Sequence, residues 1–182
     1  NVFCEKPLCL SLEDLDRIEI QASKAPRQLL MLGFNRRFSP HIIKIKKLLA
    51  PIQAPKSIII TVNAGSIPSD HWTQDLEIGG GRVIGEACHF IDLARFIVGH
   101  KIIKHTGLAA KINDTVCTDT LTISLEFSDG SFAIINYLAN GHKAVPKETV
   151  EIFTGGKVIK LDNFKKMKCW GFKGISKMNL WK

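Results

Sequence analysis

Apolar residues recur at helical spacing across the segment GGGRVIGEACHFIDLARFIVG, residues 79–99. Residues at this spacing share one side of a helix, so the pattern predicts a largely buried helix. The segment opens on three glycines, which allow the backbone to approach a partner closely. It closes on Gly99, a residue type favoured just past a helix end. The apolar positions are Val83, Ile84, Ala87, Phe90, Ile91, Ala94, Ile97 and Val98.

Three polar residues interrupt this apolar helix: Glu86, His89 and Asp92, each three residues from the next. They form one polar strip on a helix surface. Their burial costs free energy unless they pair with other polar groups or serve a function. One alternative is a structural histidine between carboxylates that ion-pair with Arg82 and Arg95. Another is a metal site, but its Glu-x-x-His spacing needs a second copy on another helix, and the sequence has none. The glycine run and the two acids favour a functional strip without a metal.

The first residues predict the closing strand–helix–strand unit of a doubly wound parallel sheet. Val2–Cys4 is a short apolar strand, and Ser11 caps a helix that Pro26 ends. Residues 28–34 form a nearly continuous apolar run, the pattern of a parallel strand covered on both faces. The G-x-G-x-x-G turn of dinucleotide-binding domains does not occur in the 182 residues. We therefore expect residues 1–38 to be the end of a dinucleotide-binding domain, and the chain to be a C-terminal fragment of a longer protein.

From residue 39 onward the pattern predicts a second unit, an α/β substrate-binding and oligomerisation domain over residues 39–182. Ser39-Pro40 provides the cap and first-turn proline of a helix, and residues 57–63 form a strand. The polar loop at residues 64–81 is long enough to carry function. Its Trp72 either packs on the core or contacts substrate.

Two hairpins follow, at residues 121–138 and 149–161, each around a glycine-containing turn. With residues 57–63 and 106–112 they predict an α+β fold, an open and mainly antiparallel sheet of five or six strands with helices on one face. The other, half-apolar face needs a cover, and a partner subunit is the usual solution. We therefore expect a homo-oligomer. The basic tail, residues 165–182, shows no firm pattern.

Composition narrows the classes of function. A net charge of +8 is compatible with nucleic-acid binding, but the lysines are dispersed and no recognisable binding module accompanies them. A simpler explanation of the positive charge is that it attracts an anionic, phosphate-bearing substrate or cofactor. Five cysteines without a Cys-x-x-Cys pair indicate a reducing, cytoplasmic setting. No segment has the length of a membrane span or the pattern of a signal peptide, so neither nucleic acid nor membrane is an expected partner.

Three motifs together resemble a known family. VFCEKPL at residues 2–8, GFNRRFSP at residues 33–40 and the glycine-rich run leading to His-x-x-Asp are similar to the glucose–fructose oxidoreductase/inositol dehydrogenase/rhizopine-catabolism (Gfo/Idh/MocA) family. The resemblance runs from residue 1 to about Gly141 and is closest to the branch of bacterial sugar and cell-surface polysaccharide pathways. It implies hydride exchange between NAD or NADP and a hydroxyl or keto group of a sugar or sugar derivative, with nucleotide sugars among the candidates.

The resemblance also implies roles for individual residues. His89 matches the catalytic histidine, which takes the hydroxyl proton, and Lys6 matches the lysine whose cation holds the reacting oxygen near the nicotinamide. The residues implied on the cofactor side are Glu5, Lys6 and Pro7. Those implied on the substrate side are Asp92, Glu86, Trp72 and Arg37.

One position departs from the family pattern, because Gly85 stands where the family commonly has an Asp. Glu86 is the candidate to orient His89 in its place. Two other interpretations stay open: a catalytically inactive dimerisation or binding module of the same fold, and a basic nucleic-acid binder. Without a glycine-rich phosphate turn, we expect the isolated chain to bind cofactor poorly and to be inactive.

Overall fold

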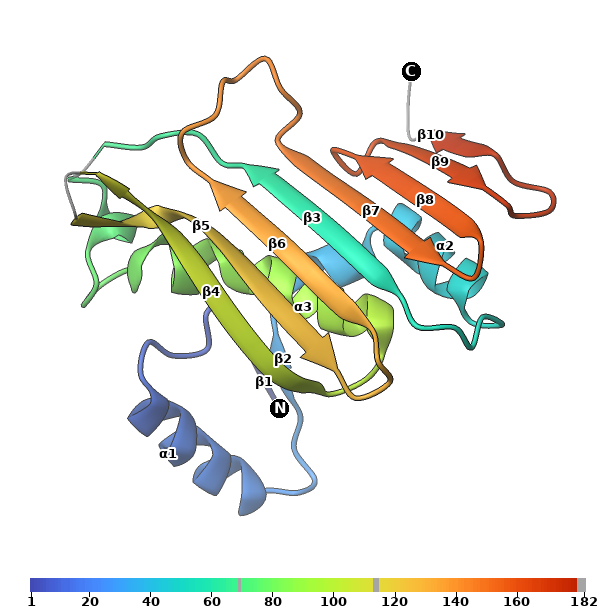
Figure 1. The fold of residues 1–182 in the computed structure, drawn as a ribbon. Helices are drawn as coiled ribbons and strands as arrows, with labels where there is room; N and C mark the ends of the chain where they lie inside the picture. Colours follow the sequence, from blue (N-terminus) through green and yellow to red (C-terminus); the bar gives the residue numbers. More distant parts are fainter. Residues whose placement is uncertain (69, 113–114, 180–182) are drawn as a thin grey trace.

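The computed structural model describes residues 1–68, 70–112 and 115–179 and contains one large and one small sheet. The large sheet has the strand order β10-β9-β8-β7-β3-β6-β5-β4 (Figure 1). β3 and β6 run parallel, and the other neighbouring pairs are antiparallel. Its strands are β3 (Ser57–Asn63), β4 (Ile102–Ile112), β5 (Thr115–Phe127), β6 (Phe132–Leu138), β7 (Glu148–Thr154), β8 (Lys157–Asp162), β9 (Lys166–Trp170) and β10 (Lys177–Asn179).

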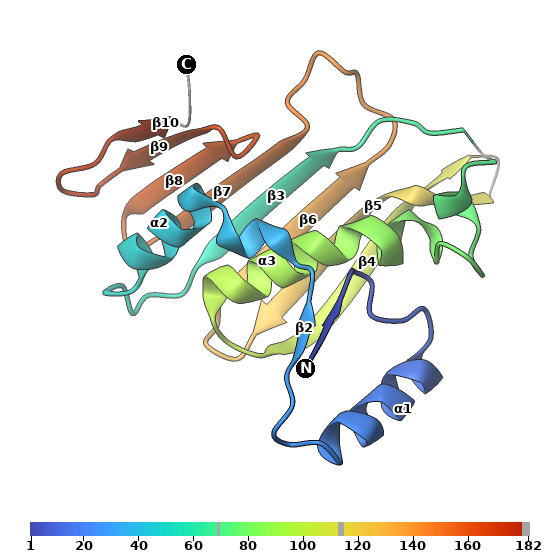
Figure 2. The same cartoon turned by 180° about the vertical axis from the view of Figure 1, so that it is seen from behind.

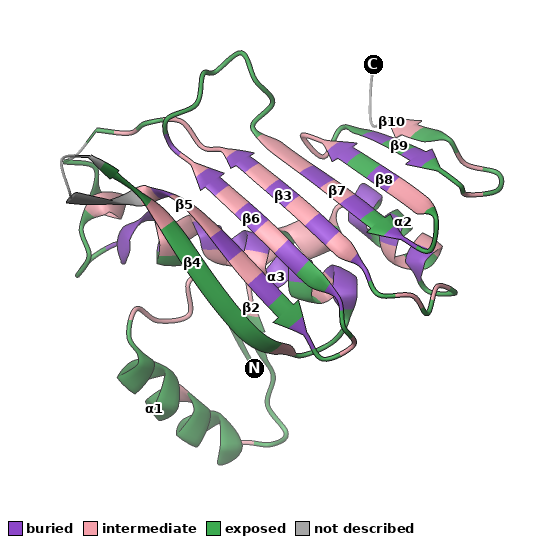
Figure 3. Cartoon of the chain, in the orientation of Figure 1, coloured by how far each residue is buried: buried purple, intermediate pink, exposed green. Residues whose placement is uncertain are grey.

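Two helices, α2 (Pro40–Leu49) and α3 (Cys88–Val98), cover one face of this sheet (Figure 2). The strands bury every second residue against them, which produces the alternating bands of Figure 3. Burial of these apolar side chains is the main favourable contribution to folding. The core includes Ile42, Ile45, Ile58, Ile60, Leu93, Ile97, Ile135 and Ile152, all fully buried.

The N-terminal residues form the small sheet, in which β1 (Val2–Cys4) pairs in parallel with β2 (Leu30–Leu32). Between them lies α1 (Leu12–Ser23), whose N-terminus is capped by the Ser11 hydroxyl as predicted. The described residues do not themselves provide the predicted cover on both faces of residues 28–34. Leu30 is 41% and Met31 48% exposed, because α1 does not close over β2 and has no buried residue of its own.

The predicted mainly antiparallel sheet with helices on one face is confirmed, but it has eight strands where five or six were predicted. The additional strands are β9 and β10, which lie in the basic tail. The last residues of that tail, 180–182, lie outside the described residues. Both predicted hairpins are present, as β5–β6 and β7–β8.

The predicted helix at residues 83–98 is present but not uniform. It begins with a π-helical turn at Val83–Ala87 and continues as α3, and Gly99 ends it in the left-handed conformation, φ 84°. No helix among the described residues combines the length and apolar character needed to cross a membrane. Cys4, Cys9, Cys88 and Cys169 are free thiols, and the side chain of Cys117 lies outside the described residues.

Candidate functional site

The π-helical turn and the first turn of α3 carry the polar strip predicted from the sequence. His89 and Asp92 lie on α3 and are buried, with exposed fractions of 8% and 9%. Glu86 lies in the π-helical turn and is more open. Among the described residues His89 Nδ1 is buried without a hydrogen-bond partner. His89 is therefore not fully paired, and the Nδ1 of the buried His41 on α2 lacks a partner in the same way.

Lys6 reaches this strip from the loop after β1. Its Nζ donates a hydrogen bond to the carbonyl oxygen of Gly85, 2.5 Å away, and the Lys6–Pro7 peptide bond is cis. A Cβ atom on Gly85 would lie 3.2 Å from the carbonyl oxygen of Gly79, which is a tight contact. At position 85, Lys6 thus meets a backbone carbonyl oxygen rather than a side chain.

Glu86 is held by two buried side chains. The Tyr137 hydroxyl donates to Glu86 Oε2 at 2.5 Å, and Arg82 Nη2 lies 3.5 Å from the same oxygen. Burial alone raises the pKa of Glu86, but the Tyr137 hydrogen bond and the charges of Arg82, Lys147 and Lys6 outweigh it and lower the pKa. Burial and the Glu86 carboxylate raise the pKa of Tyr137. At neutral pH, Glu86 is therefore a carboxylate and Tyr137 its hydrogen-bond donor.

Asp92 is paired with Arg37, so the structure brings these two predicted substrate-side residues together. Arg37 Nε donates to Asp92 Oδ2 at 2.6 Å, and Arg37 Nη2 donates to Oδ1. This hydrogen bond raises the pKa of Arg37. Arg95, the partner considered for a structural role, does not pair with Asp92 in the described residues. Each carboxylate oxygen has a second lone pair, so Asp92 retains capacity to accept a hydroxyl.

Arg36 is a residue of the site that the sequence did not single out. It stands beside Arg37 in a short 3-10 turn, Asn35–Phe38. Its guanidinium donates to both oxygens of Glu148 on β7, at 2.6 and 3.2 Å, and lies 4.6 Å from the centre of the Phe90 ring. The two adjacent arginines of the motif GFNRRFSP were the available signal for Arg36. In the structure they pair with different acids, Arg36 with Glu148 and Arg37 with Asp92.

The electrostatic surroundings keep His89 neutral. Burial is the largest cause, followed by the positive charges of Arg36 and Lys6, and together they lower its pKa from 6.5 to about 4. The Glu86 carboxylate opposes this effect without cancelling it. At neutral pH the imidazole is therefore in the form that can accept a proton, and a bound group that raises this pKa toward the working pH would make it a stronger base.

Two predicted residues lie apart from this cluster. Trp72 is 61% exposed, with its ring centre 5.9 Å from that of His71, so it does not pack on the core. The carboxylate of Glu5 lies against Gly33, where an added Cβ would meet Glu5 Oε2 at 2.7 Å. Within the described residues, no group of three or more His, Cys, Asp or Glu side chains is placed to bind a metal ion.

The fold and the strip on α3 define a mixed α/β protein with a candidate proton-transfer site. The profile of the oxidoreductase family, C-terminal alpha/beta domain (Gfo/Idh/MocA), matches residues 56–157, which is more than half of the chain. The chain therefore belongs to this family.

Similar proteins agree with this assignment. The uncharacterized oxidoreductase YrbE of Bacillus subtilis is 31% identical over 162 residues, 84% of this chain and 46% of that protein. Myo-inositol 2-dehydrogenase of Thermotoga maritima is 28% identical over 170 residues, 90% of this chain and 49% of that protein. The chain thus spans about half the length of these relatives. The solved aldose-aldose oxidoreductase of Caulobacter crescentus has the same fold, with a TM-score of 0.79 at 17% identity over 100% of this chain and 56% of that one.

Proposed function

We propose that the protein carrying this chain is a nicotinamide-dependent oxidoreductase that acts on a hydroxyl or keto group of a sugar or sugar derivative, nucleotide sugars included. The observation that carries the proposal is a neutral, buried His89 beside the Lys6 ammonium and the Glu86 carboxylate. The family and its myo-inositol 2-dehydrogenase member support it. In this proposal residues 1–38 end a dinucleotide-binding domain, residues 39–182 form the substrate domain, and the enzyme is a cytoplasmic homo-oligomer.

His89 acts as the proton acceptor in the oxidation direction. Because Nδ1 is buried, we assign the transfer to Nε2, which takes the proton of the substrate hydroxyl. A base in contact with the reacting group contributes about a hundredfold or more to such a step. In the reduction direction the same atom returns the proton to the substrate oxygen.

Lys6 supplies the positive charge beside the reacting oxygen. An ammonium group has three N–H donors, and the carbonyl of Gly85 takes one of them. The remaining donors fit both a substrate oxygen and a nicotinamide amide, and Glu5, Lys6 and Pro7 are the residues of this chain that would hold the cofactor. NAD or NADP, when bound, supplies the hydride acceptor or donor.

The competing proposal is a catalytically inactive module of the same fold. The replacement of the family's Asp by Gly85 is the observation that favours it. Against it, Glu86 lies three residues before His89 on consecutive helical turns and is fixed by Tyr137 and Arg82.

Replacement of His89 tests the proposed function in the full-length protein. Turnover with NAD or NADP is measured on myo-inositol and on a panel of sugars and UDP-sugars, per folded active site. We expect His89→Ala to lower the turnover number by about a hundredfold or more with a smaller change in apparent substrate affinity. Lys6→Ala should act similarly, whereas Asp92→Ala should act mainly on substrate affinity.

His41 provides a matched control, since it is a fully buried histidine on α2 whose Nε2 lies 3.2 Å from the carbonyl oxygen of Met178. His41→Ala should lower the melting temperature and leave turnover per folded site near that of the wild type. If His89→Ala behaves like His41→Ala, His89 has only a structural role. Wild-type protein without activity on any substrate of the panel would favour the inactive module.

A further inference from the structure

An open cavity of ≈ 810 Å³ lies between the segment that follows β3 and the loop that joins β6 to β7. It is lined by residues 63–66, residues 141–147 and Asn163. Because β3 and β6 are parallel neighbours, both segments leave the sheet at the same end. The volume is within the range of small-molecule sites, roughly 300–1,000 Å³. Nothing in the proposed roles of His89, Lys6 and Glu86 accounts for this cavity.

The cavity wall is fixed by hydrogen bonds from Asn63. Its Nδ2 donates to the carbonyl oxygens of His142 and Val145, at 2.8 and 3.2 Å. Its backbone N–H donates to the carbonyl oxygen of Lys147 at 2.8 Å. The backbone of Gly141 packs so closely that an added Cβ would lie 1.9 Å from Asn63 Oδ1. The loop is therefore held in place over the end of β3.

The lining is positively charged. Lys143 and Lys147 contribute two ammonium groups and His142 an imidazole, and none of the described lining residues is acidic. Of the neighbouring acids, Glu86 lies 3.5 Å from Arg82 and Glu148 pairs with Arg36, which leaves Asp162, beside Asn163, as one carboxylate against two lysines. An anion in the cavity would therefore meet uncompensated positive charge, which favours phosphate groups.

The cavity also adjoins the proposed reaction site. Arg82 connects the two, because its Nη1 donates to the carbonyl oxygen of Gly65 at 2.7 Å while its Nη2 lies beside Glu86. The Lys147 ammonium is close enough to contribute to the lowered pKa of Glu86. A ligand that extends from the reaction site past Glu86 and Arg82 would enter the cavity at Gly65.

We propose that this cavity binds a phosphate group of the substrate. The inference rests on the proposed function and narrows it: the sugar carries phosphate, either as a sugar phosphate or as a nucleoside-diphosphate sugar. Lys143 and Lys147 are the cationic contacts, and the Asn63-fixed loop positions them.

The test is calorimetric titration of the full-length protein, saturated with NAD or NADP so that the cofactor's own phosphate sites are filled. The probes are UDP and glucose 6-phosphate, with uridine and glucose as neutral comparators. We expect at least one phosphate probe to bind and its neutral comparator to bind at least tenfold more weakly. Tighter binding of UDP identifies a nucleotide sugar, and tighter binding of glucose 6-phosphate a sugar phosphate.

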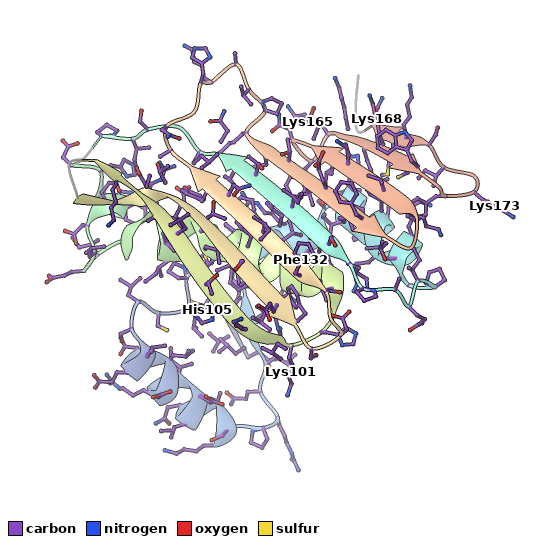
Figure 4. The ribbon with its side chains drawn as sticks, in the orientation of Figure 1. Lys101, His105, Phe132, Lys165, Lys168 and Lys173 are labelled. Carbon is purple, nitrogen blue, oxygen red and sulfur yellow. The ribbon has the colours of Figure 1, made fainter. Side chains whose placement is uncertain are left out.

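The double variant Lys143→Ala/Lys147→Ala should weaken binding of the phosphate probe by about tenfold or more, and Lys147→Arg in the wild-type background should largely preserve it. Lys101→Ala/Lys173→Ala removes the same charge away from the cavity (Figure 4) and should change affinity less than twofold. Lys101 adjoins the β5–β6 turn, at the opposite end of β6 from the cavity.

Failure of both phosphate probes to bind would overturn the proposal, as would equal weakening by the two double variants. The outcome is independent of turnover. His89→Ala should still bind the phosphate probe, so loss of the catalytic assignment leaves this result intact. Conversely, His89-dependent turnover of an uncharged sugar without phosphate binding would refute this proposal alone.

Discussion

The groups around the His89 imidazole disfavour its charged form. Burial removes solvation, and the charges of Arg36 and Lys6 act in the same direction. Arg36 owes its position to Glu148 and Phe90, and Lys6 owes its position to the carbonyl oxygen of Gly85. The base form of His89 is thus favoured first by its burial and then by charges that other contacts hold in place, so its protonation should couple to folding.

We expect His89 to make the protein sensitive to mild acid. Its pKa is about 4 in the folded protein against 6.5 as the ordinary value, so between these pH values the unfolded chain binds a proton that the folded chain does not. Stability therefore falls as pH decreases from about 6.5 to 4, by up to about 3 kcal/mol from this residue. Urea unfolding of wild type and His89→Gln at pH 7.5 and 4.5 measures the effect.

The loss of stability between the two pH values should be smaller in His89→Gln than in the wild type. An equal loss in both proteins would mean that His89 does not carry this pH dependence. Activity, if it depends on the base form, should be retained at neutral pH and decrease only at acid pH.

The sequence predicted the polar strip but not what surrounds it. Three-residue spacing and the family motif together identify Glu86, His89 and Asp92. Alternation along β6 indicates that Tyr137 is buried, yet nothing local shows that its hydroxyl meets Glu86, 51 residues earlier. Such a contact depends on how α3 lies on the sheet, which periodicity does not specify. The roles of these residues stay predictions.

At the scale of elements, the predictions missed features that depend on tertiary contacts. Helical spacing does not distinguish the π-helical turn at Val83–Ala87 from the α-helix that follows it. The strands β9 and β10 escaped notice because they are short and lysine-rich. In β9, Met167 and Cys169 face the core while Lys166 and Lys168 are exposed, a pattern typical of strands near a sheet edge.

The glycine run before the π-helical turn was predicted to let the backbone approach a partner closely, and at Gly79 it does so. A Cβ on Gly79 would lie 2.6 Å from both the Trp72 carbonyl oxygen and the Thr73 Cα. Gly80 and Gly81 follow with φ of 69° and 72°. The partner of this close approach is the chain's own short 3-10 helix, Trp72–Gln74, rather than a ligand.

Gly79→Ala should therefore destabilise the protein. The clashing atoms belong to the backbone and cannot turn aside as a side chain would, so a cost of roughly 1–3 kcal/mol is expected for this overpacking. Thermal and urea unfolding measure it. Gly107→Ala in β4 is the control, because its Cβ would lie 3.8 Å from the nearest atom, an ordinary contact. Equal stability of the two variants would contradict the close packing at Gly79.

At the scale of the whole molecule, the large sheet has one face covered by α2 and α3 and one face that no described element covers. The two faces differ in composition. The covered face is apolar and buried, with Tyr137 and Phe127 among its mostly aliphatic residues. The open face mixes Thr and Ser with Ile59, Ile134 and Phe132 in the central strands and with lysines in the outer ones. Ile59 and Ile134 are register partners on β3 and β6, so the apolar part is contiguous across the middle of the sheet.

This open face is the proposed contact between subunits. Phe132 is 43% and Phe153 38% exposed, and both are paired with Ser57 in the central strands. Burial of these side chains with Ile59 and Ile134 against a second copy would remove their apolar area from water, at roughly 25 cal/mol per Å². The lysines of β9 lie toward one side of this patch and can remain solvated in such an assembly.

Ile134→Lys should shift the protein toward the monomer, because it places a charge at the centre of the proposed contact, where desolvation without a partner is costly. Sedimentation of the full-length protein at several concentrations measures the shift. Ile103→Lys is the control. Ile103 is 66% exposed on the edge strand β4, in the register irregularity between Ile102 and Lys104. Its replacement should leave the sedimentation mass of the protein unchanged. A wild-type protein that stays monomeric at high concentration would show that the open face needs no second subunit. A dimer that Ile134→Lys does not weaken would place the contact elsewhere on the surface.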